Sequence, residues 1–293
     1  MLDILIPTVA QGLMWSLLAL GVYITFRVLD VADLTVEGSF TFGAAAAATA
    51  LASGWGIAAA FVLAGICGGI AGIVTGLLTT KLRIPVLLAG ILTMIGLYSV
   101  NLHVMGKANV ALLNIDTVFT VFEERGMSVT QSMLAVSAIA AVLVTLVIYW
   151  FFGTELGAAV RATGSNPQMA RAQGVNTDRM VVFGLCVSNV LVGLSGALVA
   201  QSNGFADVGM GVGTIVIGLA SVIIGEVLFG TRSFRNWLIS VVLGSIVYRL
   251  VIAAVLAMGM PPNDLKLFTA ILVAIALALP LLREIWRGQK ARF

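Results

Sequence analysis

Apolar stretches separated by short polar intervals fill most of this chain. Nine of them have the length of hydrophobic helices, at residues 4–26, 36–52, 56–80, 84–104, 131–152, 180–202, 214–229, 237–258 and 266–283. A helix needs roughly 20 apolar residues to cross a hydrocarbon core of about 30 Å. The pattern therefore predicts about nine membrane spans. The second and seventh segments are short, so each is predicted either to cross as a short span or to re-enter against its neighbours.

Composition favours an all-α, polytopic helical membrane protein. The 293 residues are 60% hydrophobic and 10% charged, against about 25% charged in a typical soluble domain. A transmembrane β-barrel has short segments of alternating apolar and polar residues instead of long apolar runs. No basic region precedes the first segment and no small-residue cleavage site follows it, which favours a retained span over a signal peptide. We expect a single transmembrane domain over residues 1–293.

Lysine and arginine predict the orientation, because cytoplasmic loops carry an excess of both. If the C-terminus is cytoplasmic and nine segments cross, the N-terminus lies outside. The outer side then holds Lys107, Arg125 and Lys266, and Arg249 lies within a segment. The inner side holds Arg27, Lys81, Arg83, Arg161, Arg171, Arg179, Arg232, Arg235, Arg283, Arg287, Lys290 and Arg292. These charges lie between apolar runs and form no basic stripe, so nucleic acid is not an expected partner.

Small residues recur at helical spacing in the second and third segments. Gly65, Gly69, Gly72 and Gly76 follow the spacing of one helix face. Such a face lets another helix approach closely, which is the main source of helix association in lipid. The alanine-rich residues 43–50 also have small side chains. We expect both helices to lie inside a compact bundle.

Motifs for catalysis and for cofactor binding are missing from the sequence. It has no GxxxxGK(S/T) phosphate loop. Its single histidine, His103, has no neighbouring His or Cys to complete a metal site. The glycines of GMGVGT, residues 209–214, follow no predicted strand and so do not indicate a dinucleotide site. We expect no catalysis and no metal or other cofactor in this chain, which leaves transport, permeation or a structural role in a membrane complex.

The polar stretch SNPQMARAQG, Ser165 to Gly174, predicts a short helix on the cytoplasmic side. Asn166 is a favoured N-cap, Pro167 suits the first helical position, and Gly174 suits the position after the last turn. Two turns of helix are marginal alone in water. The helix therefore either lies as a connector on its own bundle or docks Met169 and the small Ala170 into a partner's groove.

The segment from Gly153 to Met180 resembles the cytoplasmic coupling segment of one family, the permease subunits of ATP-binding cassette importers for branched-chain amino acids and ribose-type sugars. The residues that match its pattern are Thr154, Gly157, Arg161, Ala162, Gly164, Asn166, Ala170, Gly174, Val175 and Asn176. Arg171 stands where the family has a second alanine. Two other segments, 31–44 and 222–250, are also similar to the family. Glu37 and the TRSFRN run, residues 231–236, are most similar to a branch of uncharacterised or aromatic amino acid (tryptophan or tyrosine) importers.

This resemblance implies the membrane subunit of an ATP-driven importer, with 153–179 as its coupling segment. The implied partners are a second permease copy, two cytoplasmic ATP-binding subunits, an extracytoplasmic substrate-binding protein and membrane lipid. ATP and magnesium would be bound by the ATP-binding subunits, not by this chain. The implied location is the inner (plasma) membrane of a bacterial cell, and an amino acid or similar small polar solute is the expected substrate. The coupling residues would be Asn166, Pro167, Met169, Ala170, Arg171 and Gly174.

Polar residues within or beside the apolar segments are candidates for a solute pathway or gate. Glu226 and Arg249 either form a structural pair inside the bundle or serve the pathway. Asp33 and Glu37 either cap the second helix or meet a cationic group of the substrate. Asn101, Gln201 and Asn203 lie near predicted outer ends, where a solvated interface is favoured over a pathway mouth.

Two other classes of function remain open from the residues alone. One is an exporter or ion-driven carrier without an ATPase, and the other is a structural subunit of a membrane complex. Binding of an ATPase at residues 166–173 separates the importer from the carrier. Solute flux separates both transporters from the structural subunit. The outer interval 105–130, which carries Asp116, Glu123 and Glu124, is either a solvated loop or a contact for a binding protein.

Overall fold

The computed structural model describes residues 2–259, 261, 264, 267–275 and 278. The elements in this part of the chain, in order, are α1 (Leu2–Tyr23) with a π-helical turn η1 (Ile24–Val28), α2 (Thr35–Ala52), α3 (Ile57–Thr80), α4 (Val86–Met105), β1 (Asn109–Ala111), α5 (Thr120–Glu123), α6 (Val129–Phe152), α7 (Glu155–Ser165), α8 (Pro167–Ala172), α9 (Thr177–Asn203), β2 (Phe205–Asp207), α10 (Thr214–Phe229) and α11 (Phe234–Ala257). The described structure is mostly helical, which confirms the all-α class.

Six described helices are long and apolar enough to cross a membrane. They are Leu5–Val28, Ile57–Thr80, Val86–Met105, Val129–Phe152, Thr177–Asn203 and Phe234–Ala257. The two short segments are helical as expected, α2 with 18 residues and α10 with 16 residues. Of the ninth segment, residues 267–275 are helical and most of the remainder lies outside the described residues.

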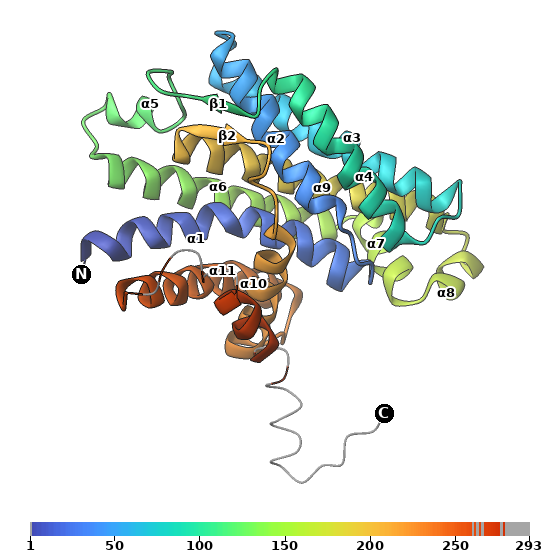
Figure 1. The fold of residues 1–293 in the computed structure, drawn as a ribbon. Coiled ribbons are helices and arrows are strands. Elements are labelled where there is room, and N and C mark those ends of the chain that lie inside the picture. The colour runs from blue at the N-terminus through green and yellow to red at the C-terminus, as the bar shows by residue number, and fades with distance from the viewer. Residues whose placement is uncertain (1, 260, 262–263, 265–266, 276–277, 279–293) are drawn as a thin grey trace.

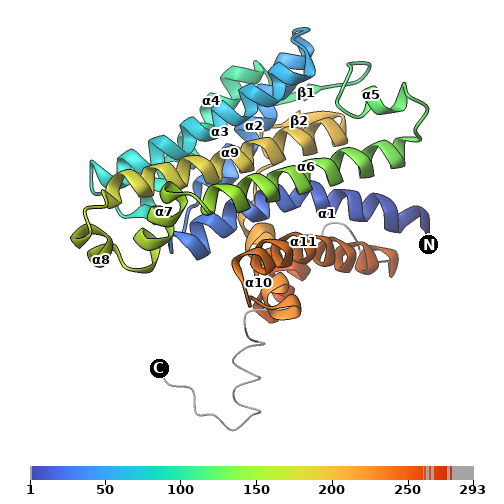
Figure 2. The ribbon, with the colours of Figure 1, turned by 180° about the vertical axis from the view of Figure 1, so that it is seen from behind.

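The long helices lie side by side, and each end of the bundle carries its own small elements (Figures 1 and 2). At one end, β1 pairs antiparallel with β2 beside α5 and the start of α1. At the opposite end lie α7 and α8. The pairing of β1 with β2 orders part of the interval 105–130, for which the sequence predicted no strand. We call the two ends the strand end and the α8 end.

Glycines hold α3 against α9, as the sequence predicted. A side chain at Gly72 or Gly76 would meet the backbone at Leu185 or Val182. Because the paired numbers rise along α3 and fall along α9, the two helices are antiparallel. The expectation for residues 43–50 is also confirmed, since Ala44, Ala45, Ala47 and Ala48 are fully buried. Close backbone approach, which favours helix packing in lipid, therefore organises this core.

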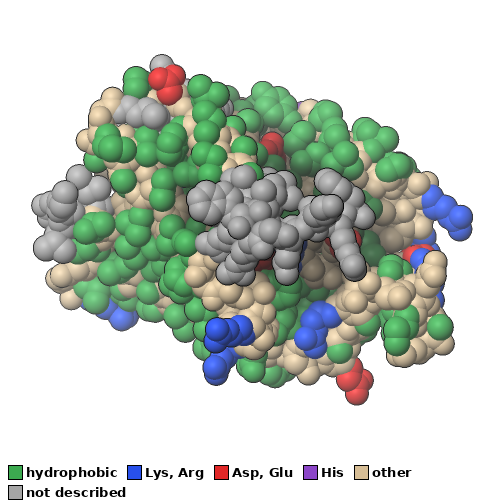
Figure 3. Space-filling model, turned by 90° about the horizontal axis from the view of Figure 1, so that it is seen from below, with side chains coloured by type: hydrophobic (Ala, Val, Ile, Leu, Met, Phe, Trp, Pro, Cys, Tyr) green, Lys and Arg blue, Asp and Glu red, His purple; other side chains and the backbone are tan. Residues whose placement is uncertain are grey.

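The exposed surface of the helices is largely hydrophobic, as Figure 3 shows for one face. On α6, Val142, Leu146 and Trp150 are 60%, 61% and 71% exposed. Water would disfavour such a continuous apolar stripe, whereas the hydrocarbon of a bilayer accommodates it.

Two sets of three helices repeat one arrangement. The first set is α1, α2 and α3, and the second is α9, α10 and α11; in each, a short helix follows a long one. The short helix of each set packs on the long first helix of the other, α2 on α9 and α10 on α1. Hydrogen bonds from Ser188 to the Gly21 carbonyl and from Ser195 to the Met14 carbonyl show that α1 and α9 are antiparallel. The two sets therefore run through the bundle in opposite directions.

Candidate functional site

The short helix α8 forms as the sequence predicted, with its caps in place. Asn166 Oδ1 accepts a hydrogen bond from the Met169 backbone N–H at 3.0 Å, and Pro167 occupies the first helical position. Gly174 has a φ of +85° and follows the last turn, a conformation that costs little only in glycine. Ala170 is buried against the protein while Met169 is 59% exposed. The helix therefore rests on its own bundle through one face and presents methionine on the other.

Arg171 ties α8 to the beginning of α9. Its Nε donates to Thr177 Oγ1 at 2.6 Å, and its guanidinium pairs with Asp178 Oδ1 at 3.2 Å. Both charged side chains are well exposed, 64% and 58%, so the ion pair contributes little stability by itself. Its effect is to hold α8 at a fixed angle on α9, which an alanine at position 171 cannot do.

A second helix in this segment, α7, was missed by the sequence analysis. Thr154 caps it by accepting from the Gly157 N–H at 3.3 Å, and the signal in the sequence is this threonine directly before Glu155 in the first turn. Gly164 packs against the Val28 carbonyl at the end of η1 so closely that no side chain fits. Arg161 lies over the Phe234 ring at the start of α11, 5.3 Å from its centroid. Helix α7 thus touches the ends of α1 and α11.

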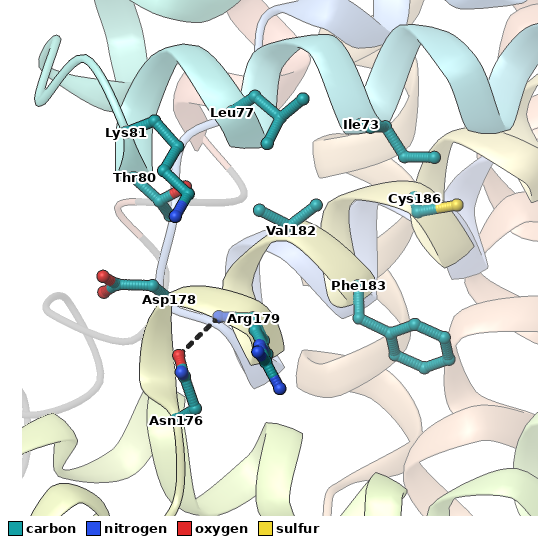
Figure 4. A pocket seen from close by; sticks show the side chains of 10 residues that line it. All are labelled: Ile73, Leu77, Thr80, Lys81, Asn176, Asp178, Arg179, Val182, Phe183 and Cys186. Carbon is teal, nitrogen blue, oxygen red and sulfur yellow. Dashed lines mark hydrogen bonds between the residues drawn. The ribbon is translucent and has the colours of Figure 1, made fainter.

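A pocket of about 430 Å³ lies beside these helices, between the end of α3 and the start of α9 (Figure 4). Lys81 and Arg179 line its polar part, and Ile73 and Phe183 line its apolar part. Asp178 also lines it and is the carboxylate that holds Arg171. The α8 end of the bundle therefore combines basic side chains, an exposed methionine and a hollow surface.

Glu226 and Arg249 do not pair with each other, so that interpretation is wrong. Glu226 accepts from Arg27 Nε at 2.8 Å, from Arg27 Nη2 at 2.5 Å and from Trp237 Nε1 at 2.8 Å. Arg249 lies over the Trp15 ring, 4.1 Å from its centroid. The two residues lie too far apart along the bundle to pair. Glu226 is near the end of α10, and α11 starts next to that end. Arg249 lies 15 residues along α11, which is about 22 Å from its start at 1.5 Å per residue.

Asp33 belongs to a buried polar network at the start of α2. Its Oδ1 accepts from the Thr35 N–H at 2.9 Å, a capping contact, and its Oδ2 accepts from Asn189 Nδ2 at 2.8 Å. Asn189 Oδ1 in turn accepts from Ser39. The network fixes the start of α2 beside the middle of α9.

Glu37 lies in the first turn of α2, but it contacts a different helix. Its Oε1 accepts from the backbone N–H of Gly213, the residue that precedes α10, at 2.9 Å. The side chain lines a cavity of about 470 Å³ together with Thr41, Tyr98 and Asn101. The first turn of α2 and the start of α10 therefore meet beside a cavity.

Asn101 and Gln201 are buried, 1% and 4% exposed, so the expected solvated interface is wrong for both. Asn101 Nδ2 lies 3.4 Å from the Gly38 carbonyl, and Gln201 Oε1 accepts from the Val118 N–H at 3.0 Å. Asn101 Oδ1 and Gln201 Nε2 have no hydrogen-bond partner in the described part of the chain. Asn203, the last residue of α9, is exposed. Packing of α4 on α2 covers Asn101, and the segment before α5 contacts Gln201 through Val118.

Comparison with known proteins identifies what this architecture resembles. A family profile described as "Branched-chain amino acid transport system / permease component" matches residues 4–277. The tyrosine transport system permease protein of Clostridioides difficile (strain R20291) is 40% identical over 274 residues, which cover 94% of this chain and 90% of the relative. An uncharacterised protein of Rickettsia prowazekii (strain Madrid E) is 32% identical over 94% of this chain and 98% of its own length.

More distant matches extend the likeness. The autoinducer 2 import system permease protein LsrC of Yersinia pseudotuberculosis serotype O:1b (strain IP 31758) is 29% identical over 72% of this chain and 58% of its own length. Among solved structures, an inward-facing conformation of a putative metal-chelate type ABC transporter matches with a TM-score of 0.50. That match covers 96% of this chain and 85% of the other at 14% identity, which is a likeness of fold alone.

Proposed function

The chain belongs to the family of permease components of branched-chain amino acid transport systems, and from this we propose that it is the membrane subunit of an ATP-binding cassette importer for an amino acid. The substrate class is supported by the relative that is named as a tyrosine transport system permease and is 40% identical. The chain forms the solute pathway and carries no catalytic site of its own. ATP hydrolysis takes place in a partner chain that binds ATP and magnesium.

The observation that carries this proposal is the geometry of α7 and α8. The segment 153–179 is the coupling segment of a single transmembrane domain. Met169 is the exposed apolar contact for an ATP-binding subunit, and Asn166, Pro167 and Gly174 set the limits of the helix that presents it. Through Arg171, movement of α8 is passed to α9, and through Gly164, movement of α7 is passed to the end of α1. An ATPase drives transport only if it binds the two permease states with different affinity.

We further propose an assembly and an orientation, which the family membership supports. Two copies of the permease line one pathway, each docks one ATP-binding subunit at the α8 end, and a substrate-binding protein delivers solute at the strand end. Nine crossings place the N-terminus outside and the C-terminus in the cytoplasm of a bacterial cell, with the chain in the inner membrane. Lys81 and Arg179 line the pocket at the α8 end, and Arg161 and Arg171 lie on α7 and α8, so this group of basic residues supports the orientation.

The pathway residues divide by their contacts. Glu37 and Asn101 share a cavity and are assigned to the pathway itself. Glu226 binds Arg27 at the α8 end and is assigned to a gate there, while Gln201 and Asn203 lie at the strand end and are assigned to the outer mouth. Asp33 and Arg249 are assigned to positioning the helices and not to the pathway itself. Asp33 holds α2 on α9, and Arg249 packs on Trp15.

Co-purification tests the coupling assignment. The tagged permease is expressed with its neighbouring ATP-binding subunit. Met169→Asp is expected to lower the amount of ATPase recovered at least about tenfold, since a charge buried at an interface costs several kcal/mol. Arg171→Glu is expected to lower it as well, because it places a second carboxylate beside Asp178 and removes the contact with Thr177 that holds α8. Met127→Asp is the matched control, because Met127 is a 42% exposed methionine at the strand end. Unchanged recovery in both α8 variants contradicts the assignment.

Uptake into proteoliposomes separates the alternative functions. The importer predicts accumulation of a radiolabelled amino acid only with the ATPase, its binding protein and ATP present. Flux that persists without an ATPase identifies an ion-driven carrier. Absence of flux, together with ATPase activity that no solute stimulates, identifies a structural subunit.

A further inference from the structure

The two short helices begin at the same place inside the bundle. Helix α2 packs on α9 with Asp33 and Ser39 both bonded to Asn189, which lies 12 residues after the start of that 27-residue helix. At 1.5 Å per residue this places the start of α2 about 18 Å inside the bundle. The Gly213 N–H at the start of α10 bonds to Glu37 at the same level. Two short helices from oppositely directed sets therefore meet near the middle of the bundle, an arrangement similar to the one in which secondary transporters place their substrate sites.

The carboxylate at this meeting point is only partly satisfied. Glu37 Oε1 accepts from Gly213, but Oε2 makes no hydrogen bond or ion pair with any residue that the structure describes. The two ion pairs of the described chain, Arg27 with Glu226 and Arg171 with Asp178, lie elsewhere at the α8 end. Hydrocarbon cannot surround a free carboxylate oxygen at low cost, so the space beside Glu37 holds water or a polar ligand.

Asn101, a residue that lines the same cavity, carries a second acceptor without a partner. Asn101 is 1% exposed, and its amide group points Nδ2 at the Gly38 carbonyl, which fixes Oδ1 as the group left over. That Oδ1 has no partner in the described residues. A buried acceptor without a partner costs roughly 1–3 kcal/mol, a cost that a ligand with N–H donors removes.

We propose that this cavity between α2, α4 and the start of α10 binds the ammonium group of the transported amino acid, with Glu37 and Asn101 as its acceptors. The proposal rests on the proposed function and adds the chemical group by which the pathway recognises its substrate. Its physical basis is complementarity, because both unsatisfied atoms accept hydrogen bonds and an ammonium carries three N–H donors with a positive charge.

The surroundings of the cavity fit this ligand and exclude others. Tyr98 lines it and offers an aromatic face, which attracts cations. Met94, Ile95 and Val212 supply apolar walls for the remainder of the molecule. A volume of about 470 Å³ lies in the range of pockets that hold small molecules. Among the described residues no lysine or arginine lines the cavity and Glu37 does, so an anion such as phosphate meets a carboxylate there without a compensating cation.

Reaction rates of an introduced thiol test the local charge directly. Ser99 lines the cavity and differs from cysteine by one atom, so Ser99→Cys is placed in the full chain with Cys67→Ala and Cys186→Ala. The positively charged aminoethyl methanethiosulfonate is expected to react faster than the negative sulfonatoethyl reagent, by about tenfold relative to their ratio at Met127→Cys. Glu37→Gln retains an oxygen for the Gly213 N–H and is expected to abolish this preference. If the ratio of the two reaction rates is the same with Glu37 as with Glu37→Gln, the proposal is overturned.

Protection by three related compounds tests the ligand group. L-tyrosine and tyramine carry an ammonium and are expected to slow modification of Ser99→Cys, whereas desaminotyrosine lacks it and is expected to have no effect. Protection is expected to fall at least about tenfold in Glu37→Gln and in Asn101→Leu. The proposal is overturned if desaminotyrosine protects as well as L-tyrosine does. It is also overturned if protection is unchanged in both Glu37→Gln and Asn101→Leu.

Transport by the wild-type complex is measured in the same proteoliposomes, so the two proposals fail separately. Amino acid uptake without protection by L-tyrosine or tyramine retains the importer and rejects the site. Protection that depends on Glu37 in a preparation without any uptake supports the site and rejects the importer.

Discussion

The ion pair between Arg27 and Glu226 should be the strongest single polar contact at the α8 end. It joins η1, the last turn of the first span, to α10 and, through Trp237, to α11. Glu226 accepts two hydrogen bonds from Arg27 and one from Trp237. Replacing Glu226 with alanine leaves the guanidinium and the indole N–H unpaired, so the loss includes their desolvation as well as the pair itself.

The magnitude follows from burial. Removing one partner of a fully buried ion pair costs about 3–5 kcal/mol. Here the side chain of Glu226 is 12% exposed but that of Arg27 is 40% exposed, so water recovers part of the loss. We expect a coupling energy of about 2 kcal/mol between the two side chains. The exposed pair of Arg171 and Asp178 should give no more than about 0.5 kcal/mol.

Two double-mutant cycles measure this difference. The variants Arg27→Ala, Glu226→Ala and their combination are unfolded in mixed micelles with increasing denaturing detergent, and the free energy of unfolding is compared with the same cycle for Arg171 and Asp178. Glu226→Gln retains an acceptor for the Trp237 indole and should recover part of the stability. If the Arg27–Glu226 coupling is no larger than that of the exposed pair, burial does not control these energies and the reasoning is refuted.

Three further outcomes are expected, the first two measured by the same unfolding method and the third by hydrogen exchange. Gly72→Val should lower the free energy of unfolding by about 2 kcal/mol or more, because a side chain there meets the backbone of α9. Gly65→Ala should lower it by about 0.5 kcal/mol at most, because the added carbon lies 3.7 Å from its nearest neighbours. Equal costs for the two variants contradict close packing of α3 on α9. Gly174→Ala should lower the free energy of unfolding by about 1 kcal/mol, because φ is positive at this residue. Gly96→Ala should raise it by about 0.5–1 kcal/mol, because Gly96 lies within a helix with open space around it. Two changes of the same sign contradict this explanation. Asn166→Ala should weaken α8 by about 1 kcal/mol and speed hydrogen exchange at the Met169 amide, while Asn166→Asp should retain the cap; equal exchange in both variants argues against capping.

The features that the sequence predicted correctly depend on neighbours within one or two helical turns. The caps of α8 are an example, since Asn166 bonds to an amide three residues away and Gly174 needs only its own φ. The glycine face of α3 is another, because helical periodicity alone places those residues on one side. The seventh apolar segment was predicted at the residues that α10 occupies, 214–229.

The predictions that failed required knowledge of depth and of helix rotation. Glu226 has Arg27 as its partner, 199 residues away in sequence, and Arg249 was excluded by its distance along α11. Asn101 and Gln201 look like interfacial residues in the sequence because they lie near helix ends. They are buried because Asn101 packs on α2 at Gly38 and Gln201 binds the Val118 N–H of the segment that precedes α5.

What the sequence by itself determined was the class of protein, the apolar segments, the concentration of basic residues beyond them and the short helix α8 with its caps. Tertiary structure decided which polar groups meet, including Glu37 with Gly213 across 176 residues and Asp33 with Asn189 across 156. The physical reason is that lipid and the neighbouring helices are equally apolar. A far larger share of α9 than of α6 is buried although both are strongly hydrophobic, so hydrophobicity marks a helix as membrane-embedded without marking the face that packs.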